Sequence, residues 1–433
     1  MGILGQFDTA DQAAQLGASR ARSRALTQDI EGEQWIGPCL PIVNPVLWEI
    51  GHITWFEERW CLRWRADGSF AASVLPGADA LYDSSAIAHD LRWNLPLPAP
   101  DATRAYQDQV RDMVQARLQR ECDNANLAYF ARLAACHEDM HAEALQYTRQ
   151  TLGYAAPQLP PQDAATPIAA SVETGGDAFI AGGRYLLGAA RGQGFVFDNE
   201  KWEHAVEVRP FRIARCSVSN AQFAEFVEDR GYVRPELWSD AGWRWLRQSR
   251  ARAPRYWRRR GGQWQQRRFD TWRPLPLLEP VIHVNWHEAQ AYCRYAGRRL
   301  PSEAEWEMAA SESGAGTKRH YPWGDDPPDV RRANLEGSAP VPVAALPAGA
   351  SAHGCRQLIG NVWEWTDSTF AAYPGFELDP YKEYSQPWFG THMVLRGGSF
   401  ATPARLIRNT WRNFYTPERY DIFAGFRTCA IAT

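Results

Sequence analysis

Several features that mark membrane and secreted proteins are missing from this sequence of 433 residues. No stretch approaches the roughly eighteen consecutive apolar residues of a transmembrane helix, and Met1 to Ala10 lacks the regions of a secretion signal. The eight cysteines are scattered without Cys-x-x-Cys pairs, in a chain large enough to fold without disulfides. We therefore expect a cytoplasmic protein with reduced cysteines.

A strong net charge is also missing. The 47 Lys and Arg residues nearly balance the 50 Asp and Glu residues, which gives a net charge of −3 and no global attraction to nucleic acid or membranes. The one dense basic run, Arg255 to Arg260 with Arg267 and Arg268 nearby, is interpreted as a solvated loop. The sequence thus predicts neither a nucleic-acid partner nor a membrane partner.

The pentapeptide His137-Glu138-Asp139-Met140-His141 has the histidine spacing of a metal site. Residues four apart lie about 40° from each other around a helix, so both imidazoles can reach one ion. Such a pair alone is more often an ordinary polar helix face. His52 changes this balance because it lies in Asn44 to Glu58, an apolar helix with Asn44 as the expected N-cap and Pro45 in its first turn. Three histidines leave coordination positions open, which suits a catalytic zinc or a non-haem iron.

The chain divides into a helical part and a loop-rich part. Residues 1–154 hold long helical patterns that predict a four-helix bundle with the metal site. Residues 155–174 are rich in Pro, Ala and Gln, which is typical of an exposed linker. Residues 175–433 combine many Gly, Pro and Trp residues with short apolar runs, and Ser302 and Glu305 form a capping box there. The helical patterns are Asp8 to Ile30, Asn44 to Arg65, Asp101 to Glu121 and Asn124 to Leu152.

A series of motifs in the second part resembles the formylglycine-generating-enzyme-like domain. That domain is a variant of the C-type lectin fold, so the resemblance implies an α+β unit with much irregular structure. Formylglycine-generating enzymes carry two copper-binding cysteines in the stretch that corresponds to Ala401 to Ala424, which has none here. We therefore do not expect that activity. The motifs are Val284-Asn-Trp-His-Glu-Ala-Gln-Ala-Tyr-Cys293, Arg299-Leu-Pro-Ser-Glu-Ala-Glu-Trp-Glu307, Tyr321-Pro-Trp-Gly324, Gly360-Asn-Val-Trp-Glu-Trp365, Leu395-Arg-Gly-Gly-Ser-Phe400 and Gly425-Phe-Arg427.

The first part resembles the DinB-like helical bundle, whose members bind metal through three histidines. This bundle followed by a formylglycine-generating-enzyme-like domain is the architecture of the ergothioneine-biosynthetic sulfoxide synthases and of the related selenoneine synthases. In these enzymes a mononuclear non-haem iron(II) activates O2 to bond sulfur or selenium to the imidazole of hercynine. The resemblance implies that His52, His137 and His141 hold iron(II). It also implies that the partners are small molecules, namely hercynine, O2 and a selenosugar or thiol.

Departures from the sulfoxide synthases favour the selenium branch. Met140 stands at a substrate-binding position inside the histidine pentapeptide, where those enzymes often have a glutamine that holds the hercynine carboxylate. Tyr415 aligns with an acidic residue that binds the amino group of γ-glutamylcysteine in one type of sulfoxide synthase. The segment Asn44 to Phe56 also looks more like selenoneine synthases. We therefore expect carbon–selenium bond formation with a selenosugar donor, and a sulfoxide synthase that uses cysteine or γ-glutamylcysteine is the alternative.

The resemblance also implies roles for individual residues. Tyr415 is the candidate proton donor, although packing against Trp363 to Trp365 explains this tyrosine equally well. Asn413 is a candidate for holding the hercynine carboxylate, and Arg419 for binding an anionic or hydroxyl-rich group. Tyr82 lies in a segment that contributes active-site tyrosines in some relatives, with an ordinary buried role as the alternative.

Two other classes of protein stay open. A zinc-dependent transferase of the DinB-like kind would activate a thiol without O2. A binding protein would use the lectin-like domain for a sugar or a partner and would have a degenerate bundle, which the intact set of three histidines disfavours. Metal analysis and oxygen consumption separate the first of these from the iron enzyme.

Overall fold

The computed structural model describes residues 9–159, 175–192, 194–313 and 318–431. The chain divides into two compact units, the first made of residues 1–159 and 192–195 and the second of residues 160–191 and 196–433. Of the predicted linker, residues 160–174 lie outside the described residues. In the parts of the chain that are described, none of the helices has both the length and the apolar character that a membrane span requires.

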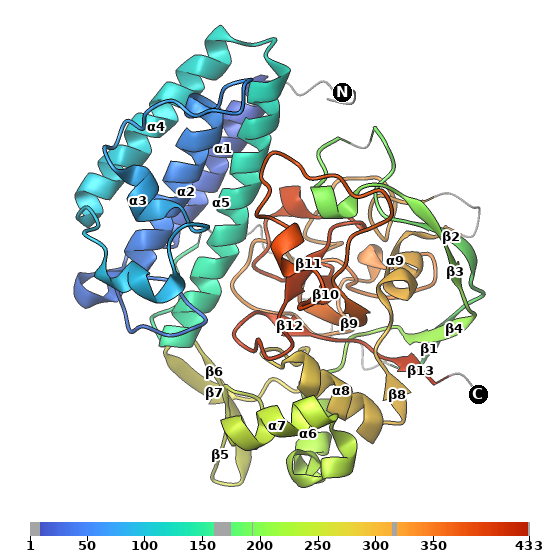
Figure 1. Cartoon of the computed structure of the whole chain (residues 1–433). Coiled ribbons are helices and arrows are strands. Elements are labelled where there is room, and N and C mark those ends of the chain that lie inside the picture. The colour runs from blue at the N-terminus through green and yellow to red at the C-terminus, as the bar shows by residue number, and fades with distance from the viewer. Residues whose placement is uncertain (1–8, 160–174, 193, 314–317, 432–433) are drawn as a thin grey trace. The chain divides into compact units, whose positions relative to one another are not determined.

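Four long helices build the first unit, as predicted (Figure 1). Helices α1 and α2 each pack against α4 and α5. The long helices are α1 (Thr9–Ala25), α2 (Val46–Glu58), α4 (Pro100–Arg120) and α5 (Ala125–Leu152). The short elements are η1 (Gly32–Trp35), a π-helical turn (Arg59–Arg63), α3 (Ala78–Tyr82) and η3 (His89–Asn94).

The start of α2 differs from the prediction. Pro45, and not Asn44, is the N-cap residue, and no side chain caps this helix. The Asn44 amide instead donates from Nδ2 to Glu49 Oε2 at 3.0 Å. The Asn44 Oδ1 accepts from Arg92 Nη1 at 2.7 Å and not from the first helical amides, so the assignment of Asn44 as N-cap was wrong.

A buried ion-pair quartet joins the four long helices, with one residue from each. Arg20 of α1 contacts Glu57 of α2 at 2.9 Å and Glu138 of α5 at 2.8 Å. Arg111 of α4 contacts the same two carboxylates at 2.9 and 3.5 Å. All four side chains are at most 9% exposed. Because an unpaired charge in this position would be costly, the quartet restricts how the helices can rotate against each other.

Small sheets and four helices make up the second unit. One sheet has the strand order β1-β4-β13-β8, a second has the order β11-β10-β9-β12, and β2 with β3 and β5 with β6 and β7 form two more. The helices are α6 (Asn220–Glu228), α7 (Asp240–Ser249), α8 (Trp286–Tyr295) and α9 (Glu303–Ser311). The strands are β1 (Asp177–Ile180), β2 (Gly183–Leu187), β3 (His204–Val208), β4 (Phe211–Ala214), β5 (Trp257–Arg260), β6 (Gln263–Arg268), β7 (Thr271–Pro274), β8 (Arg298–Arg299), β9 (Trp363–Thr369), β10 (Met393–Arg396), β11 (Asn413–Tyr415), β12 (Ala424–Gly425) and β13 (Cys429–Ala430). The predicted α+β character with much irregular structure is confirmed.

The motifs recognised in the sequence supply the buried ion pairs of this unit. Arg427 of the Gly-Phe-Arg motif contacts Glu364 of β9 at 2.6 Å. Arg396 of the Arg-Gly-Gly-Ser motif contacts Glu307 and Glu303 of α9 at 2.5 and 2.7 Å. These side chains are at most 6% exposed. Since buried charges must be paired, these motif residues determine the fold of the unit.

The arginine-rich segment is not a solvated loop, so that interpretation of the sequence was wrong. The segment forms β5 and β6, which pair antiparallel with Arg260 opposite Gln263. Gly261 and Gly262 make the two-residue turn and both have positive φ, at 58° and 80°, as hairpins of this length require. Arg268 at the end of β6 is only 7% exposed.

Candidate metal centre

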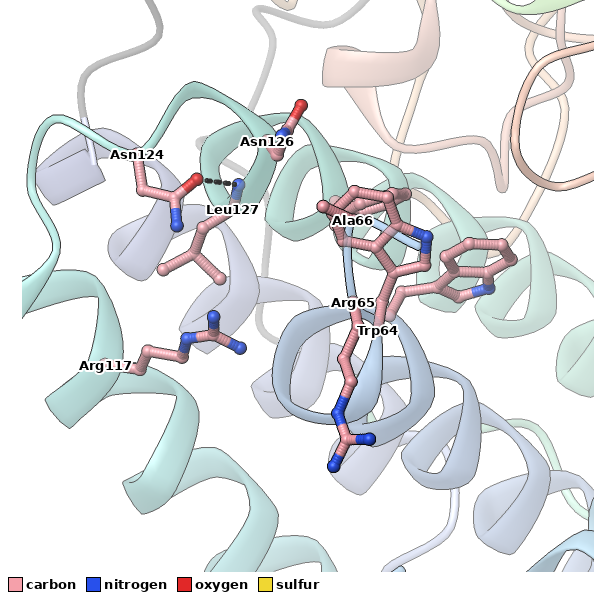
Figure 2. A pocket seen from close by; sticks show the side chains of 9 residues that line it. Trp64, Arg65, Ala66, Arg117, Asn124, Asn126 and Leu127 are labelled. Carbon is pink, nitrogen blue, oxygen red and sulfur yellow. Dashed lines mark hydrogen bonds between the residues drawn. The ribbon is translucent and has the colours of Figure 1, made fainter. Parts of the chain in front are cut away.

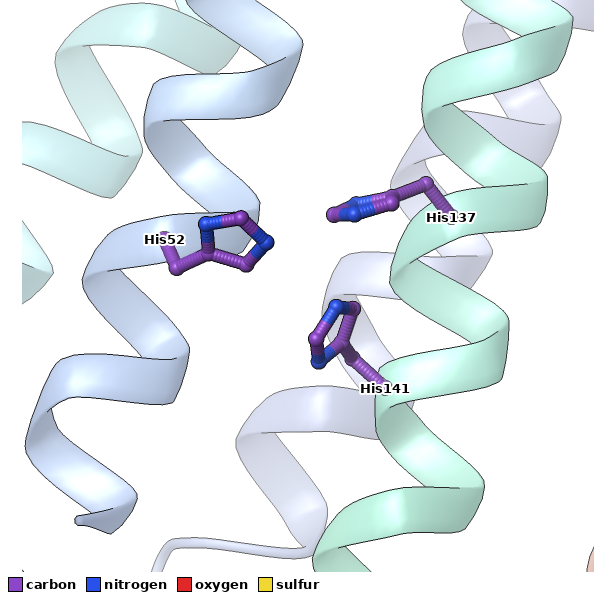
Figure 3. A group of neighbouring side chains, drawn as sticks. All are labelled: His52, His137 and His141. Carbon is purple, nitrogen blue, oxygen red and sulfur yellow. The ribbon is translucent and has the colours of Figure 1, made fainter. Parts of the chain in front are cut away.

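Helices α2 and α5 place three histidines opposite one another. His52 comes from the middle of α2, and His137 and His141 lie one turn apart on α5, with the three rings converging on the space between the helices (Figure 3). One ligand atom of each histidine lies within 4.8 Å of the other two. The ring centroids are 5.1, 5.0 and 4.5 Å apart. This spacing is short enough for the three rings to share one ion.

His52 is oriented by a main-chain hydrogen bond. Its Nδ1 lies 2.8 Å from the carbonyl oxygen of Tyr82. A carbonyl oxygen only accepts, so Nδ1 carries the hydrogen and Nε2 keeps a lone pair for a metal. The ring stacks on Trp48 with centroids 4.8 Å apart. Burial, and after it the neighbouring His141, lowers the pKa of His52 well below its usual value, so this imidazole is neutral at pH 7.

His141 is oriented by a carboxylate. Its Nδ1 donates to Glu49 Oε1 at 2.7 Å, and Glu49 is only 2% exposed. The other oxygen of Glu49 accepts from Asn44, whose own oxygen accepts from Arg92 at 2.7 Å. The carboxylate fixes the hydrogen of His141 on Nδ1 and leaves Nε2 for a metal, as carboxylate–histidine pairs do in metal sites.

His137 is held by packing. Its ring stacks on Phe56 of α2 with centroids 3.7 Å apart and planes 8° from parallel. Burial and the two neighbouring histidines lower the pKa of His137 well below its usual value. His52 and His137 are therefore neutral imidazoles, and the hydrogen bonds of His52 and His141 direct Nε2 of both rings to a metal. This set fits a divalent transition metal such as iron(II) or zinc.

Arg92 supports two of the three histidines at once. Its guanidinium lies over the Trp48 ring at 4.1 Å from the centroid, and Trp48 in turn stacks on His52. Through Asn44 the same guanidinium reaches the carboxylate that orients His141. Sequence reasoning missed Glu49, Asn44 and Arg92 as parts of the site. The available signal was a glutamate three residues before His52 in an apolar helix, where a buried carboxylate needs a partner.

Comparison with known proteins agrees with both parts of the architecture. Residues 15–145 match the DinB superfamily, and residues 163–432 match the sulfatase-modifying factor enzyme 1-like domain. The chain is 38% identical to the hercynine oxygenase of Mycolicibacterium thermoresistibile, over 89% of this chain and 87% of that enzyme. The chain belongs to the hercynine oxygenase family. It is also 37% identical to the hercynine oxygenase of Mycobacterium tuberculosis, over 96% of this chain and 97% of that enzyme.

The second part alone has a further relative. It is 35% identical to the formylglycine-generating enzyme of Streptomyces coelicolor, over 61% of this chain and 91% of that enzyme. The two domain types expected from the sequence motifs are thus confirmed in this member of the hercynine oxygenase family. Membership of the selenoneine branch stays a prediction.

The remaining candidates of the first unit lie close to the histidines in the chain. Tyr82 ends α3 and is fully buried, and burial raises its pKa to about 12. Its ring fills the space over Gly51, where an added Cβ would lie 2.2 Å from the ring. The Tyr82 carbonyl oxygen accepts from His52 Nδ1, and a substrate-binding role of the Tyr82 side chain stays a prediction. Met140 lies on α5 directly before His141 and is half-buried.

The candidates of the second unit gather at β11. Asn413 and Tyr415 belong to this strand, and Asn413 Oδ1 accepts from the amide of Phe414 at 2.9 Å. Arg419 lies over the Tyr415 ring at 4.8 Å from the centroid. Arg419 also donates to both carboxylate oxygens of Asp421 at 2.7 Å. The sequence did not indicate this partner. The structure thus brings Tyr415 and Arg419 together, and the charge of Arg419 is already balanced by a carboxylate.

Hercynine carries a trimethylammonium group, which aromatic rings can bind by cation–π attraction. A pocket of about 350 Å³ in the first unit contains such rings (Figure 2). Trp60 and Phe130 stack there with centroids 5.0 Å apart. However, the lining also contains Arg65 and Arg117. Arg117 is paired with Glu121 at 3.1 Å, but Arg65 leaves a positive charge that would repel a trimethylammonium group, so this pocket does not fit such a ligand.

Proposed function

We propose that this protein is a non-haem iron(II), O2-dependent enzyme that forms a carbon–selenium bond at the imidazole of hercynine, with a selenosugar as selenium donor. One observation supports the proposal most. A group of three imidazoles converges between α2 and α5 in a chain that is 37 to 38% identical to hercynine oxygenases. A second, sulfur-forming reaction with cysteine or γ-glutamylcysteine is the alternative within the same family.

The kinship with oxygenases favours iron(II) over zinc, because the donor set fits both metals. When bound, iron(II) supplies the activation of O2. The chain itself orients the ligands, since Tyr82 and Glu49 direct the metal-binding nitrogens of His52 and His141 inward. Trp48 and Phe56 cover two of the rings and keep water from their outer faces.

The choice of a selenosugar rests on two side chains. Met140 is half-buried beside His141, and its thioether cannot donate a hydrogen bond to a carboxylate. Tyr415 offers a phenol where a sulfoxide synthase can use an acid to bind an ammonium group. A selenosugar has no amino group that needs this acid, and it carries hydroxyl groups and a soft, readily ionised selenol.

The β11 region supplies polar groups for substrate and proton transfer in this proposal. The Asn413 side chain is fixed by the bond that its Oδ1 accepts, so its Nδ2 hydrogens are the ones that can donate to the hercynine carboxylate. Tyr415 would donate a proton through its hydroxyl. Arg419, whose Nε and one η nitrogen donate to Asp421, would bind an anionic or hydroxyl-rich group of the substrate through its guanidinium.

Single alanine substitutions test the iron assignment. His52→Ala, His137→Ala and His141→Ala should each lose iron and abolish O2-dependent turnover of hercynine, while the circular dichroism spectrum stays that of the wild type. The bundle keeps its fold because its core and its ion-pair quartet do not depend on these rings. A variant that retains stoichiometric iron and wild-type turnover would show that its histidine is not a ligand.

The zinc alternative is tested with the same protein. Anaerobic loading with iron(II) or with zinc is followed by addition of hercynine, selenoglucose and O2. The proposal requires oxygen uptake and a product mass that contains selenium only in the iron-loaded sample. Equal turnover of the zinc-loaded protein without O2 would identify a DinB-like transferase instead.

A further inference from the structure

A second pocket, in the second unit, has a basic lining that the proposed reaction does not use. Its volume is about 430 Å³, and its wall is formed by the end of α7, the loop that follows it and strands β5 and β6. Arg250, Arg252, Arg255, Arg258 and Arg259 are among its lining residues. A concave site of this volume is large enough for a small organic ligand.

The pocket carries an excess of positive charge. Five arginines line it, and Glu288 is the one acidic residue among the lining residues. Burial raises the pKa of Glu288 to about 7, so this side chain brings at most one negative charge. Within the described part of the chain, the only ion pair of these arginines is a contact of 3.9 Å between Arg259 and Glu228, both more than half exposed. Like charges gathered in one concavity repel each other unless an anion is bound between them.

Three of these arginines are held in place by aromatic rings. Arg255 lies over Tyr420 at 5.3 Å, Arg258 over Trp272 at 3.9 Å and Arg259 over Trp264 at 5.8 Å from the ring centroids. A guanidinium that stacks through its face keeps its N–H groups in the plane and can direct them to an anion. Arg258 uses only its Nε–H on a neighbouring side chain, Gln265 Oε1 at 2.9 Å. Arg255 and Arg259 stack on rings that line the pocket and are therefore preorganised for an oxyanion, whereas Arg258 stacks on Trp272 outside the lining.

We propose that this pocket binds a phosphorylated small molecule, a sugar phosphate or a mononucleotide in size. A phosphate monoester carries close to two negative charges and matches the fork of a guanidinium, whereas one carboxylate would leave most of the positive charge unbalanced. The indole rings of Trp245 and Trp264 offer flat faces for a sugar or a base. A small ligand is favoured over a nucleic acid because the net charge of the chain is −3, and the arginines meet in one concavity.

Calorimetric titration of the full-length protein tests this site independently of the iron chemistry. The probes are inorganic phosphate, glucose 6-phosphate, AMP and adenosine at a salt concentration of about 50 mM. Arg252→Ala/Arg255→Ala removes two exposed pocket cations. Arg244→Ala/Arg247→Ala is the matched control, because it removes two exposed arginines of α7 that do not line the pocket.

The expected result is saturable binding of AMP or glucose 6-phosphate, with adenosine at least about tenfold weaker than AMP. The pocket variant should weaken binding of the phosphorylated probe at least about tenfold, and the control variant should change it less than about twofold. Which phosphorylated probe binds more tightly distinguishes a sugar ligand from a nucleotide.

Several results would overturn the proposal. They are absence of saturable binding of every phosphorylated probe, equal binding of adenosine and AMP, and an equal loss in the two double variants. Tighter binding of a thymidine hexanucleotide than of AMP by more than about a hundredfold would reassign the pocket to single-stranded nucleic acid. Loss of hercynine turnover in other experiments does not bear on these outcomes, since binding alone is measured.

Discussion

Glu49 determines how His141 is presented to a metal ion. The carboxylate accepts the Nδ1 hydrogen at 2.7 Å and is itself held by Asn44. Removal of this charge makes the imidazole of His141 less basic and less firmly oriented, but it leaves all three histidines in place. The residue is therefore a positioning residue, in contrast to the histidines.

We predict that Glu49→Gln lowers the affinity for iron(II) by about tenfold or more while the protein still folds. Competition with a chromophoric chelator measures this affinity under anaerobic conditions. Glu33→Gln, at an exposed position, is the matched control and should bind iron as the wild type does. An unchanged affinity of Glu49→Gln would contradict the role of the carboxylate.

The sequence predicted the three candidate ligands but not the residues that orient them. His137 and His141 are four positions apart on one helix, so their joint orientation follows from helical geometry alone. Glu49 reaches His141 across helices, and Arg92 reaches Asn44 from a short helix far along the chain. Such contacts depend on how helices pack, which a single sequence does not specify.

At the scale of elements, the ion-pair quartet fixes the rotation of α2 against α5. Glu138 and Glu57 come from the two helices that also carry the histidines, and both are bound by Arg20 and Arg111. Because each long helix contributes one residue to the quartet, the quartet determines which face of each helix points to the bundle interior. As a consequence, the quartet holds the His52 ring of α2 opposite the two histidine rings of α5.

Breaking the quartet should be costly, because it leaves a buried carboxylate without a full partner. We predict that Arg111→Ala lowers the free energy of unfolding by about 3 to 5 kcal/mol. Arg120→Ala removes an arginine of the same helix that is 67% exposed, and it should change stability by less than about 0.5 kcal/mol. Urea denaturation followed by circular dichroism measures both values. Similar losses in the two variants would contradict the structural role of the quartet.

Elements were predicted well where local signals are strong. The helical pattern from Asn124 to Leu152 corresponds to α5, and the capping box of Ser302 and Glu305 is present on α9. The prediction failed where a side chain has a distant partner, as at Asn44. It also failed for the arginine run, because the Gly261-Gly262 turn outweighs the charge of the strands it joins.

At the scale of the whole molecule, the second unit depends on buried charges that are sensitive to acid. Burial by itself would raise the pKa of Glu307, but Lys318 and Arg396 outweigh burial and hold this pKa at about 2. The folded pKa lies below the ordinary value of 4.5, so ionised Glu307 stabilises the native state above pH 4.5. This stabilisation is lost as the pH falls from 4.5 toward 2.

We predict that the free energy of unfolding contains a term of about 3 kcal/mol from Glu307 that disappears over this range of pH. Denaturation at a series of pH values should show a shallower decline for Glu307→Gln than for the wild type. Glu207→Gln, at an exposed position, should follow the wild-type curve. Parallel curves for Glu307→Gln and the wild type would contradict the assignment.

The two-part architecture was readable because each part has its own signature, a set of histidines on helices and an ordered series of motifs. The motif residues Arg427 and Glu364 form a core ion pair, so the motifs identify the domain type. The branch within the hercynine oxygenase family depends instead on single positions such as Met140 and Tyr415. Selection of the donor is therefore the central claim that needs a direct measurement.

A competition between donors provides that measurement. Iron-loaded protein receives saturating hercynine and O2 with equal concentrations of selenoglucose and γ-glutamylcysteine, and the initial ratio of the products by mass spectrometry equals the ratio of the two kcat/KM values. The peptide donor loses the acidic partner of its amino group at Tyr415, and one such lost contact costs at least about tenfold, so we predict a selenium product in excess by about tenfold or more. Equal amounts of the two products, or an excess of the sulfur product, would contradict the account.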